Sequence, residues 1–85
     1  MKYKVFLERK ASKKLESIEQ SDKDTIKNKI AKLKDGFVPE LDIKKLKGYP
    51  NHYRLRVGRY RILFKLLEDR VIIVFAILPR KKAYK

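Results

Sequence analysis

The sequence predicts an α+β fold in which an N-terminal strand and a two-helix hairpin pack on a twisted antiparallel sheet of about four strands. The prediction depends on changes of hydrophobic period along the 85 residues. Apolar residues alternate at the start, then recur at helical spacing, and alternate again in the second half. A chain of this length is expected to form a single domain, residues 1–85, around one small core.

The first elements are expected to be a strand and two helices. Residues 2–7 alternate weakly and predict the strand. The helices are predicted from two apolar stripes at helical spacing, namely Ala11, Leu15 and Ile18, and then Ile26, Ile30 and Leu33. A break is expected at residues 20–22, with Ser21 as the N-cap of the second helix and Gly36 just beyond its end. The many lysines outside the stripes are expected to be solvated.

The second half begins with a connector and ends with a strand. Residues 37–50 are predicted to be a connector that Ile43 and Leu46 anchor to the core. Residues 68–70 are predicted to form a turn. The run 71–78 is apolar on both faces, which indicates a central strand.

The helical hairpin is expected to cover one face of this sheet, and little chain is left to cover the other. Part of that second face, around Leu63, Ile72 and Val74, is therefore predicted to be a shallow apolar floor. A partner protein or a nucleic acid would cover it.

The net charge of +14 indicates a polyanionic partner, because nucleic acid, anionic membrane and acidic proteins all attract such a chain. Six of the seven arginines lie in residues 37–85, whereas the basic residues of the first part are almost all lysine. The planar guanidinium fork matches a phosphate. The second half is therefore the expected location of the site.

Composition excludes several other classes of protein. With no cysteine and one histidine, disulfides, thiolate metal sites and histidine metal clusters are excluded. The first residues are too short and too charged for a signal peptide. The longest apolar run is too short to cross a bilayer. We expect a soluble cytoplasmic protein with no bound metal.

The most informative stretch is Tyr53–Phe64. Apolar and charged residues alternate on both sides of Gly58-Arg59, and a Gly-X pair is typical of a two-residue type II′ hairpin. The register predicted from this turn sets three pairs opposite each other: Val57 and Tyr60, Arg56 and Arg61, Leu55 and Ile62. Like charges directly across a ladder repel, so a bound anion between Arg56 and Arg61 is one interpretation. The alternative is that solvated arginines only keep the sheet edge soluble.

These residues resemble the RelE/ParE superfamily of toxins from type II toxin–antitoxin operons. The resemblance depends on a Leu-Lys-Gly connector at residues 46–48, on the Tyr-Arg-Leu-Arg-Val-Gly-x-Tyr-Arg-Ile hairpin at residues 53–62, and on a basic end with a late tyrosine at residues 80–84. It covers nearly the whole chain. The fold it implies is a helical hairpin on a twisted antiparallel sheet.

The resemblance also implies an activity. RelE-type members cut messenger RNA in the ribosomal A site without a metal or other cofactor. Their catalytic residues match Arg54, Arg56, Arg61, Arg80 and Tyr84 here. ParE-type members poison DNA gyrase and generally lack the late basic-plus-tyrosine group, so the RelE branch is favoured. Pro79 departs from the polar residue that often precedes the late arginine, and the proton-transfer groups therefore stay open.

Metal-free RNA cleavage requires proton removal from a ribose 2′-OH, charge stabilisation at phosphorus, and protonation of the leaving oxygen. Arg61 and Arg80, with Arg56 beside them, suit the second task. Arginine stays protonated and suits neither of the others. Tyr84 is a candidate for proton transfer, with stacking on a base and simple packing on the domain as alternatives. His52 is expected to line a loop rather than act as the general base.

Further basic residues are expected to hold ribosomal RNA phosphates without sequence choice, namely Lys44, Lys45, Lys47, Arg59, Lys81 and Lys82. The implied partners are an acidic RelB-like antitoxin, the ribosome and messenger RNA, with no membrane. The toxin itself is expected to be monomeric, with higher assemblies only with the antitoxin. Two alternatives remain: a ParE-like gyrase inhibitor without nuclease activity, and a non-catalytic basic RNA-binding protein.

Overall fold

The computed structural model describes residues 2–79, in which five strands form one sheet of order β1-β5-β4-β3-β2. Strand β1 pairs with β5 in parallel, and every other neighbouring pair is antiparallel. The elements in chain order are β1 (Lys4–Leu7), α1 (Arg9–Glu16), α2 (Gln20–Lys32), a 3₁₀ turn (Leu33–Asp35), β2 (Asp42–Lys45), β3 (His52–Val57), β4 (Tyr60–Leu67), a second 3₁₀ turn (Glu68–Arg70) and β5 (Val71–Pro79).

The α+β class is confirmed, with two differences in the sheet. It has five strands rather than about four, and the β1–β5 pair makes it mixed. The additional strand, β2, lies inside the segment that was expected to be a connector. Its pattern was hidden because Ile43 is the one apolar residue among its four. Short, lysine-bearing strands of this kind are typical of sheet edges.

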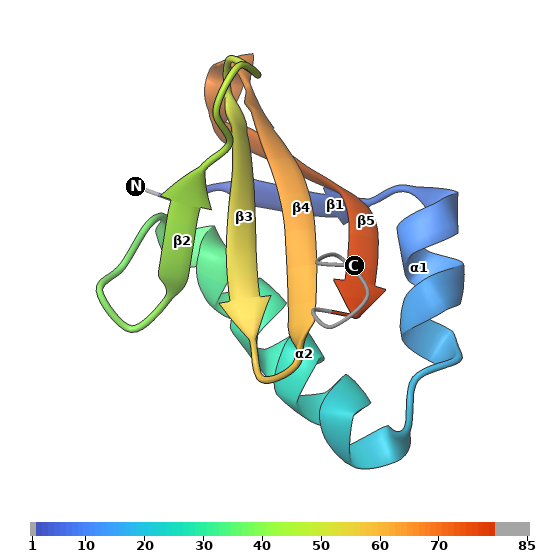
Figure 1. Ribbon diagram of the computed structural model, residues 1–85. Coiled ribbons are helices and arrows are strands. Elements are labelled where there is room, and N and C mark those ends of the chain that lie inside the picture. The colour runs from blue at the N-terminus through green and yellow to red at the C-terminus, as the bar shows by residue number, and fades with distance from the viewer. Residues whose placement is uncertain (1, 80–85) are drawn as a thin grey trace.

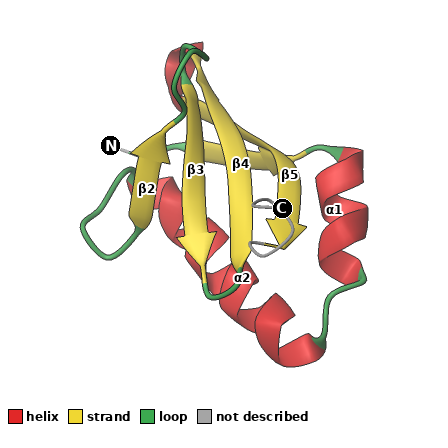
Figure 2. Cartoon of the chain, in the orientation of Figure 1, coloured by secondary structure: helices red, strands yellow, loops and turns green. Residues whose placement is uncertain are grey.

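Both helices cover the same face of the sheet. In Figure 2 strands β3, β4 and β5 face the viewer, and α2 crosses behind them. The side chains of Leu55, Ile62, Phe64, Ile72 and Val74 are fully buried on the helical face. They form one core with all six residues of the two predicted helix stripes. Burial of this apolar surface is the main favourable contribution to folding.

The helix boundaries differ from expectation. Helix α2 begins at Gln20, so Ser21 lies in its first turn, and the N-cap residue, Glu19, makes no side-chain capping bond. Gly36 follows the 3₁₀ turn with a φ of 92°, a conformation that glycine adopts without strain, and its N–H donates to the Leu33 carbonyl. The prediction that Gly36 stops the helical segment is therefore confirmed, although the last turn is 3₁₀.

The last strand lies between β1 and β4, as predicted from its apolar character (Figure 1). Its pairing with β4 is irregular: Leu63 pairs with Ala76 and Phe64 with Val74, so Phe75 is an extra residue without a partner. Such a bulge changes which residues of a strand face each side. Across residues 2–79, neither helix has the length and apolar character needed to cross a bilayer.

Candidate anion site on the arginine face

The β3–β4 hairpin has the predicted register. Val57 pairs with Tyr60, Arg56 with Arg61, and Leu55 with Ile62. Gly58 has a φ of 56°, whereas Arg59 keeps a negative φ, as a type II′ turn requires of its two central residues. The turn therefore sets two arginines directly opposite each other.

The sheet face that α1 and α2 leave uncovered carries these arginines, and we call it the arginine face. It is defined on β3 and β4 by Arg54, Arg56, Arg61, Leu63 and Lys65. Paired residues point to the same side of a sheet, so the register builds cross-strand rows. One row runs Asp42, Arg56, Arg61, and the next runs Lys44, Arg54, Leu63. Four cationic side chains thus occupy two adjacent rows.

Asp42 is a residue of this site that sequence reasoning missed. Its Oδ1 lies 3.7 Å from Nη1 of Arg54, and its Oδ2 lies 4.0 Å from Nε of Arg56. The carboxylate therefore partly offsets the like-charge repulsion on β3. Its signal was weak, because a single aspartate in an expected loop resembles any turn residue. The Asp42–Arg56 pairing becomes visible only once β2 is recognised as a strand.

Arg54 is unusual because it is buried. The whole Arg54 residue is 8% exposed, and its Nη1 is buried without a hydrogen bond to residues 2–79. The neighbouring Arg56 side chain is 43% exposed. A buried donor without an acceptor costs about 1–3 kcal/mol. The fold therefore holds the guanidinium at a cost, and an external anion would recover part of it.

Comparison with known proteins identifies the family. Residues 5–84 match the family model described as the ParE toxin of the type II toxin–antitoxin system parDE. RelE1 of Methanocaldococcus jannaschii is 36% identical over 88 residues, covering 100% of this chain and 98% of that protein. The chain belongs to the RelE/ParE superfamily of type II toxins.

Two solved structures resemble the toxin closely. The first is the RelB–RelE antitoxin–toxin complex from Methanococcus jannaschii, with a TM-score of 0.79 and 34% identity, covering 94% of this chain and 95% of that one. The second is the archaeal RelE–RelB complex from Pyrococcus horikoshii OT3, with a TM-score of 0.81 and 28% identity over 94% and 97% of the two chains. The resemblance to the RelE branch noted in the sequence is confirmed.

Other predicted contacts of the toxin are distributed around this site. Lys44 shares a row with Arg54, whereas Lys45 pairs with Tyr53 and so points to the helical side. Lys47 and Arg59 are exposed in the turns before β3 and β4. The remaining candidates, Arg80, Lys81, Lys82 and Tyr84, lie outside the described residues. The last described residue, Pro79, pairs with Tyr60, next to Arg61.

His52 lies at the far end of the arginine face. Its Nδ1 is 2.8 Å from the Pro50 carbonyl oxygen, which can only accept, so Nδ1 carries the proton. His52 is four residues from Arg56 along β3, a separation of about 13 Å. The ring lines a cavity of about 380 Å³ with Leu46, Tyr49, Leu63 and Phe75. This position agrees with the expected loop-lining role.

The predicted apolar floor was correct at Leu63 and wrong at Ile72 and Val74. Both of the latter are fully buried on the helical face. Their β4 partners, Leu66 and Phe64, face the same side, opposite to Leu63. The bulged Phe75 contributes to the floor instead.

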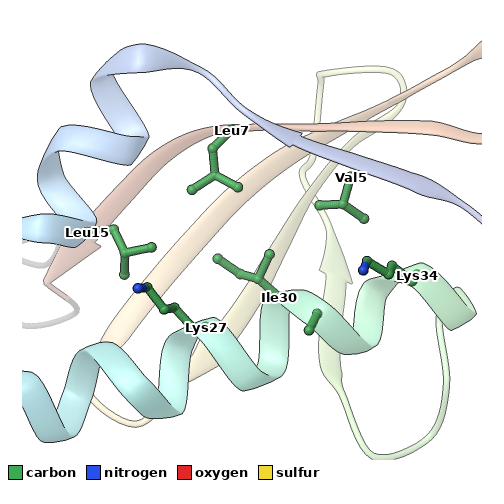
Figure 3. Close-up of a pocket in the computed structure, with 7 residues that line it drawn as sticks. Val5, Leu7, Leu15, Lys27, Ile30 and Lys34 are labelled. Atoms are coloured by element: carbon green, nitrogen blue, oxygen red, sulfur yellow. The ribbon is translucent and has the colours of Figure 1, made fainter.

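A second cavity, of about 270 Å³, lies on the helical side between β1 and the two helices. Figure 3 shows Ile30 of α2 pointing toward Val5 and Leu7, with Lys27 and Lys34 on either side of it along the helix. The lining is apolar apart from these lysine side chains. This groove is separated from the arginine face by the sheet.

Proposed function

We propose that the toxin is a ribosome-dependent endoribonuclease that cuts messenger RNA in the ribosomal A site. The observation that carries the proposal is the juxtaposition of Arg56 and Arg61 across the hairpin, with Arg54 in the adjacent row. The RelE names of its relatives support the same branch. Because its substrate would be messenger RNA on a translating ribosome, the activity belongs in the cytoplasm.

The proposed reaction needs no metal. The ribose 2′-oxygen attacks the adjacent phosphorus, the bond from phosphorus to the 5′-oxygen breaks, and a 2′,3′-cyclic phosphate and a 5′-hydroxyl form. A base takes the 2′ proton, and an acid protonates the 5′-oxygen. Arg56 and Arg61 would hold the non-bridging oxygens as negative charge develops, a role in which preorganised donors are most effective. Arg80 would join them from the end of the chain.

The two proton transfers need groups other than arginine, because its guanidinium stays charged. His52 is an unsuitable base because it lies about 13 Å along the strand from Arg56. Tyr84 remains our candidate, because cations close to a phenol favour its phenolate form. Replacement by phenylalanine removes only the hydroxyl, so Tyr84→Phe should abolish cleavage if the tyrosine moves a proton. Cleavage at the normal rate would assign Tyr84 to stacking or packing.

The decisive experiment uses purified ribosomes programmed with a defined message, and primer extension to map and time the cuts. Arg61→Gln is expected to slow cleavage by about 100-fold or more, the range seen when one oxyanion donor is removed. The matched control is Arg9→Gln, the same chemical change at an exposed arginine on α1. Equal rates for Arg61→Gln and the wild-type toxin would refute the assignment.

We further propose that an acidic RelB-like antitoxin binds the toxin and covers the arginine face. The net charge of +14 favours an acidic partner, and similar solved structures are RelE–RelB complexes. The free toxin would be monomeric. Co-expression with a RelB-like antitoxin should relieve growth arrest, and mass measurement by light scattering should detect higher assemblies only with that partner.

A second candidate function is inhibition of DNA gyrase. It is favoured by the matching family model, which is described as a ParE toxin. A gyrase poison would leave messages intact and produce DNA breaks in cells that express the toxin. Cut messages without DNA breaks support the first proposal, and the reverse result supports the second.

A further inference from the structure

The cavity at the far end of the arginine face has an aromatic lining. We call it the ring pocket and define it by Leu46, Tyr49, His52, Leu63 and Phe75. The His52 ring centroid lies 5.5 Å from that of Phe75 and 6.0 Å from that of Tyr49. Its volume of about 380 Å³ falls in the range of small-ligand pockets.

The rim of the ring pocket is held in place by the backbone. The Tyr49 N–H donates to the Leu46 carbonyl, and the His52 N–H donates to the Tyr49 carbonyl. Asn51, with a φ of 61°, closes the loop, and its carbonyl accepts from Leu66 on β4. Tyr49 is nevertheless 61% exposed. A fixed loop that presents an exposed ring beside an apolar floor has the form of a binding site rather than of core packing.

The ring pocket is continuous with the cationic rows. His52 and Arg54 are two residues apart on β3, so their side chains share a face about 7 Å apart. Lys65 pairs with His52 across the β3–β4 ladder, and its ammonium lies 5.9 Å from the centre of the Phe75 ring. A ligand that fills the pocket must therefore suit both aromatic walls and a neighbouring row of positive charge.

We propose that the ring pocket holds one unpaired nucleobase of an RNA whose backbone binds to the cationic rows. Every base has a flat face that stacks on aromatic rings, and its own phosphate is negatively charged. The separation between His52 and Arg54 is comparable to the span of one extended nucleotide. The His52 Nδ1 donates to Pro50, which leaves Nε2 of the neutral ring as an acceptor for a base N–H.

This inference rests on the proposed function, because it takes RNA as the ligand of the arginine face. An apolar side chain from an acidic protein partner is the competing occupant. The acidic residues of such a partner would suit the cationic rows, but an apolar side chain makes no use of the His52 acceptor, which a base N–H can donate to. We therefore favour the base and let the experiment include the peptide.

The test is a binding cycle between one base and one ring. The probes are a fluorescein-labelled five-nucleotide RNA with 2′-O-methyl riboses, which cannot be cleaved, and five versions that each lack one base. Fluorescence anisotropy gives the Kd for the full-length toxin, for Tyr49→Ser and for Phe6→Ser. Phe6 is the control because it is an exposed aromatic residue on β1, outside the ring pocket. Circular dichroism checks that each variant is folded.

Loss of one particular base should weaken binding to the wild-type toxin on the order of tenfold, as expected for one stacked base. Tyr49→Ser should bind the intact RNA about tenfold more weakly and show no further loss at that position. Phe6→Ser should behave as the wild type does. The proposal would be overturned if all five RNAs that lack one base had the same Kd as the intact RNA. It would also be overturned if the loss of affinity at one position were the same in Tyr49→Ser as in the wild-type toxin.

A labelled acidic, leucine-containing peptide completes the assay. If the peptide binds more weakly to Tyr49→Ser while removal of any one base leaves the Kd of the RNA unchanged, the ring pocket receives a protein partner and the base assignment is wrong. Failure of the pocket and failure of the nuclease remain distinct. If the toxin cleaves messages on ribosomes but no single base affects its Kd, only the pocket proposal is wrong. If one base affects the Kd through Tyr49 but no cleavage occurs on ribosomes, only the nuclease proposal is wrong.

Discussion

Arg54→Met is expected to make the toxin more stable and less active. The side chain of Arg54 is 10% exposed, and its Nη1 is buried without a hydrogen bond to residues 2–79. Methionine has a similar length, fills irregular space and leaves no donor unsatisfied. Replacing a buried ion pair by apolar side chains is often stabilising, and the carboxylate that this variant leaves behind, that of Asp42, is 56% exposed and stays hydrated.

The expected magnitude follows from two opposing contributions. The unsatisfied donor costs about 1–3 kcal/mol. Attraction between Arg54 and the Asp42 Oδ1 at 3.7 Å offsets about 1 kcal/mol of this cost. The dielectric constant of water applies because the Asp42 side chain is 56% exposed. The variant should therefore gain up to about 2 kcal/mol in free energy of unfolding. For a domain of this size, each kcal/mol raises Tm by about 4–8 °C.

The assay is thermal and urea denaturation followed by circular dichroism, with Arg56→Met as the matched control. Arg56 is the adjacent arginine on the same face, but its side chain is 43% exposed. Its replacement should change the free energy of unfolding by no more than about 0.5 kcal/mol. Both variants should lose cleavage on programmed ribosomes. A destabilised Arg54→Met, or equal shifts for the two variants, would refute the argument that burial of Arg54 is costly.

Three further predictions concern charge and packing. Asp42→Asn should lower the free energy of unfolding by about 0.2–1 kcal/mol at low salt. Added phosphate should reduce this loss, because it can bind Arg54 and Arg56 in place of the carboxylate. The same loss in Glu40→Gln, whose carboxylate pairs with no residue of the described chain, would contradict this. Phe64→Ala, at a fully buried position, should cost about 3–5 kcal/mol in urea denaturation, and a cost below 1 kcal/mol would place Phe64 outside the core. The Lys2 ammonium, 2.8 Å from Asp35, lowers the pKa of that carboxyl. A lowered pKa stabilises the fold above the ordinary value near 3.8, and this contribution is lost as pH falls through the folded-state pKa. The stability difference between the wild-type toxin and Lys2→Ala should thus shrink on acidification, and a difference that grows would contradict the pairing.

The hairpin was predictable because local chemistry determines it. Strict alternation identifies the two faces, and Gly58 specifies the turn, so the opposition of Arg56 and Arg61 follows from the sequence alone. Strand β2 could not be found in the same way. It is extended because it pairs with the edge of β3, and a four-residue pattern with one apolar residue carries no signal of that pairing. Asp42 was missed for the same reason.

The apolar floor illustrates a different limit. A strand that is apolar at every position has no alternation, so its sequence does not say which residues face the helices. The bulge at Phe75 then shifts the order of facing between Val74 and Ala76. The assignments of Ile72 and Val74 failed on this point, and the ring pocket could not be foreseen because it depends on Phe75. The roles of Arg80 and Tyr84 stay predictions.

The position of β5 has a consequence for synthesis of the toxin. Strand β5, which is synthesised last among the described strands, lies inside the sheet, where it joins β1 to β4 and supplies Ile72, Val74 and Ile77 to the interior. A nascent chain that lacks it cannot complete this interior. The toxin fold, and any activity that depends on it, is therefore complete only after β5 has been synthesised.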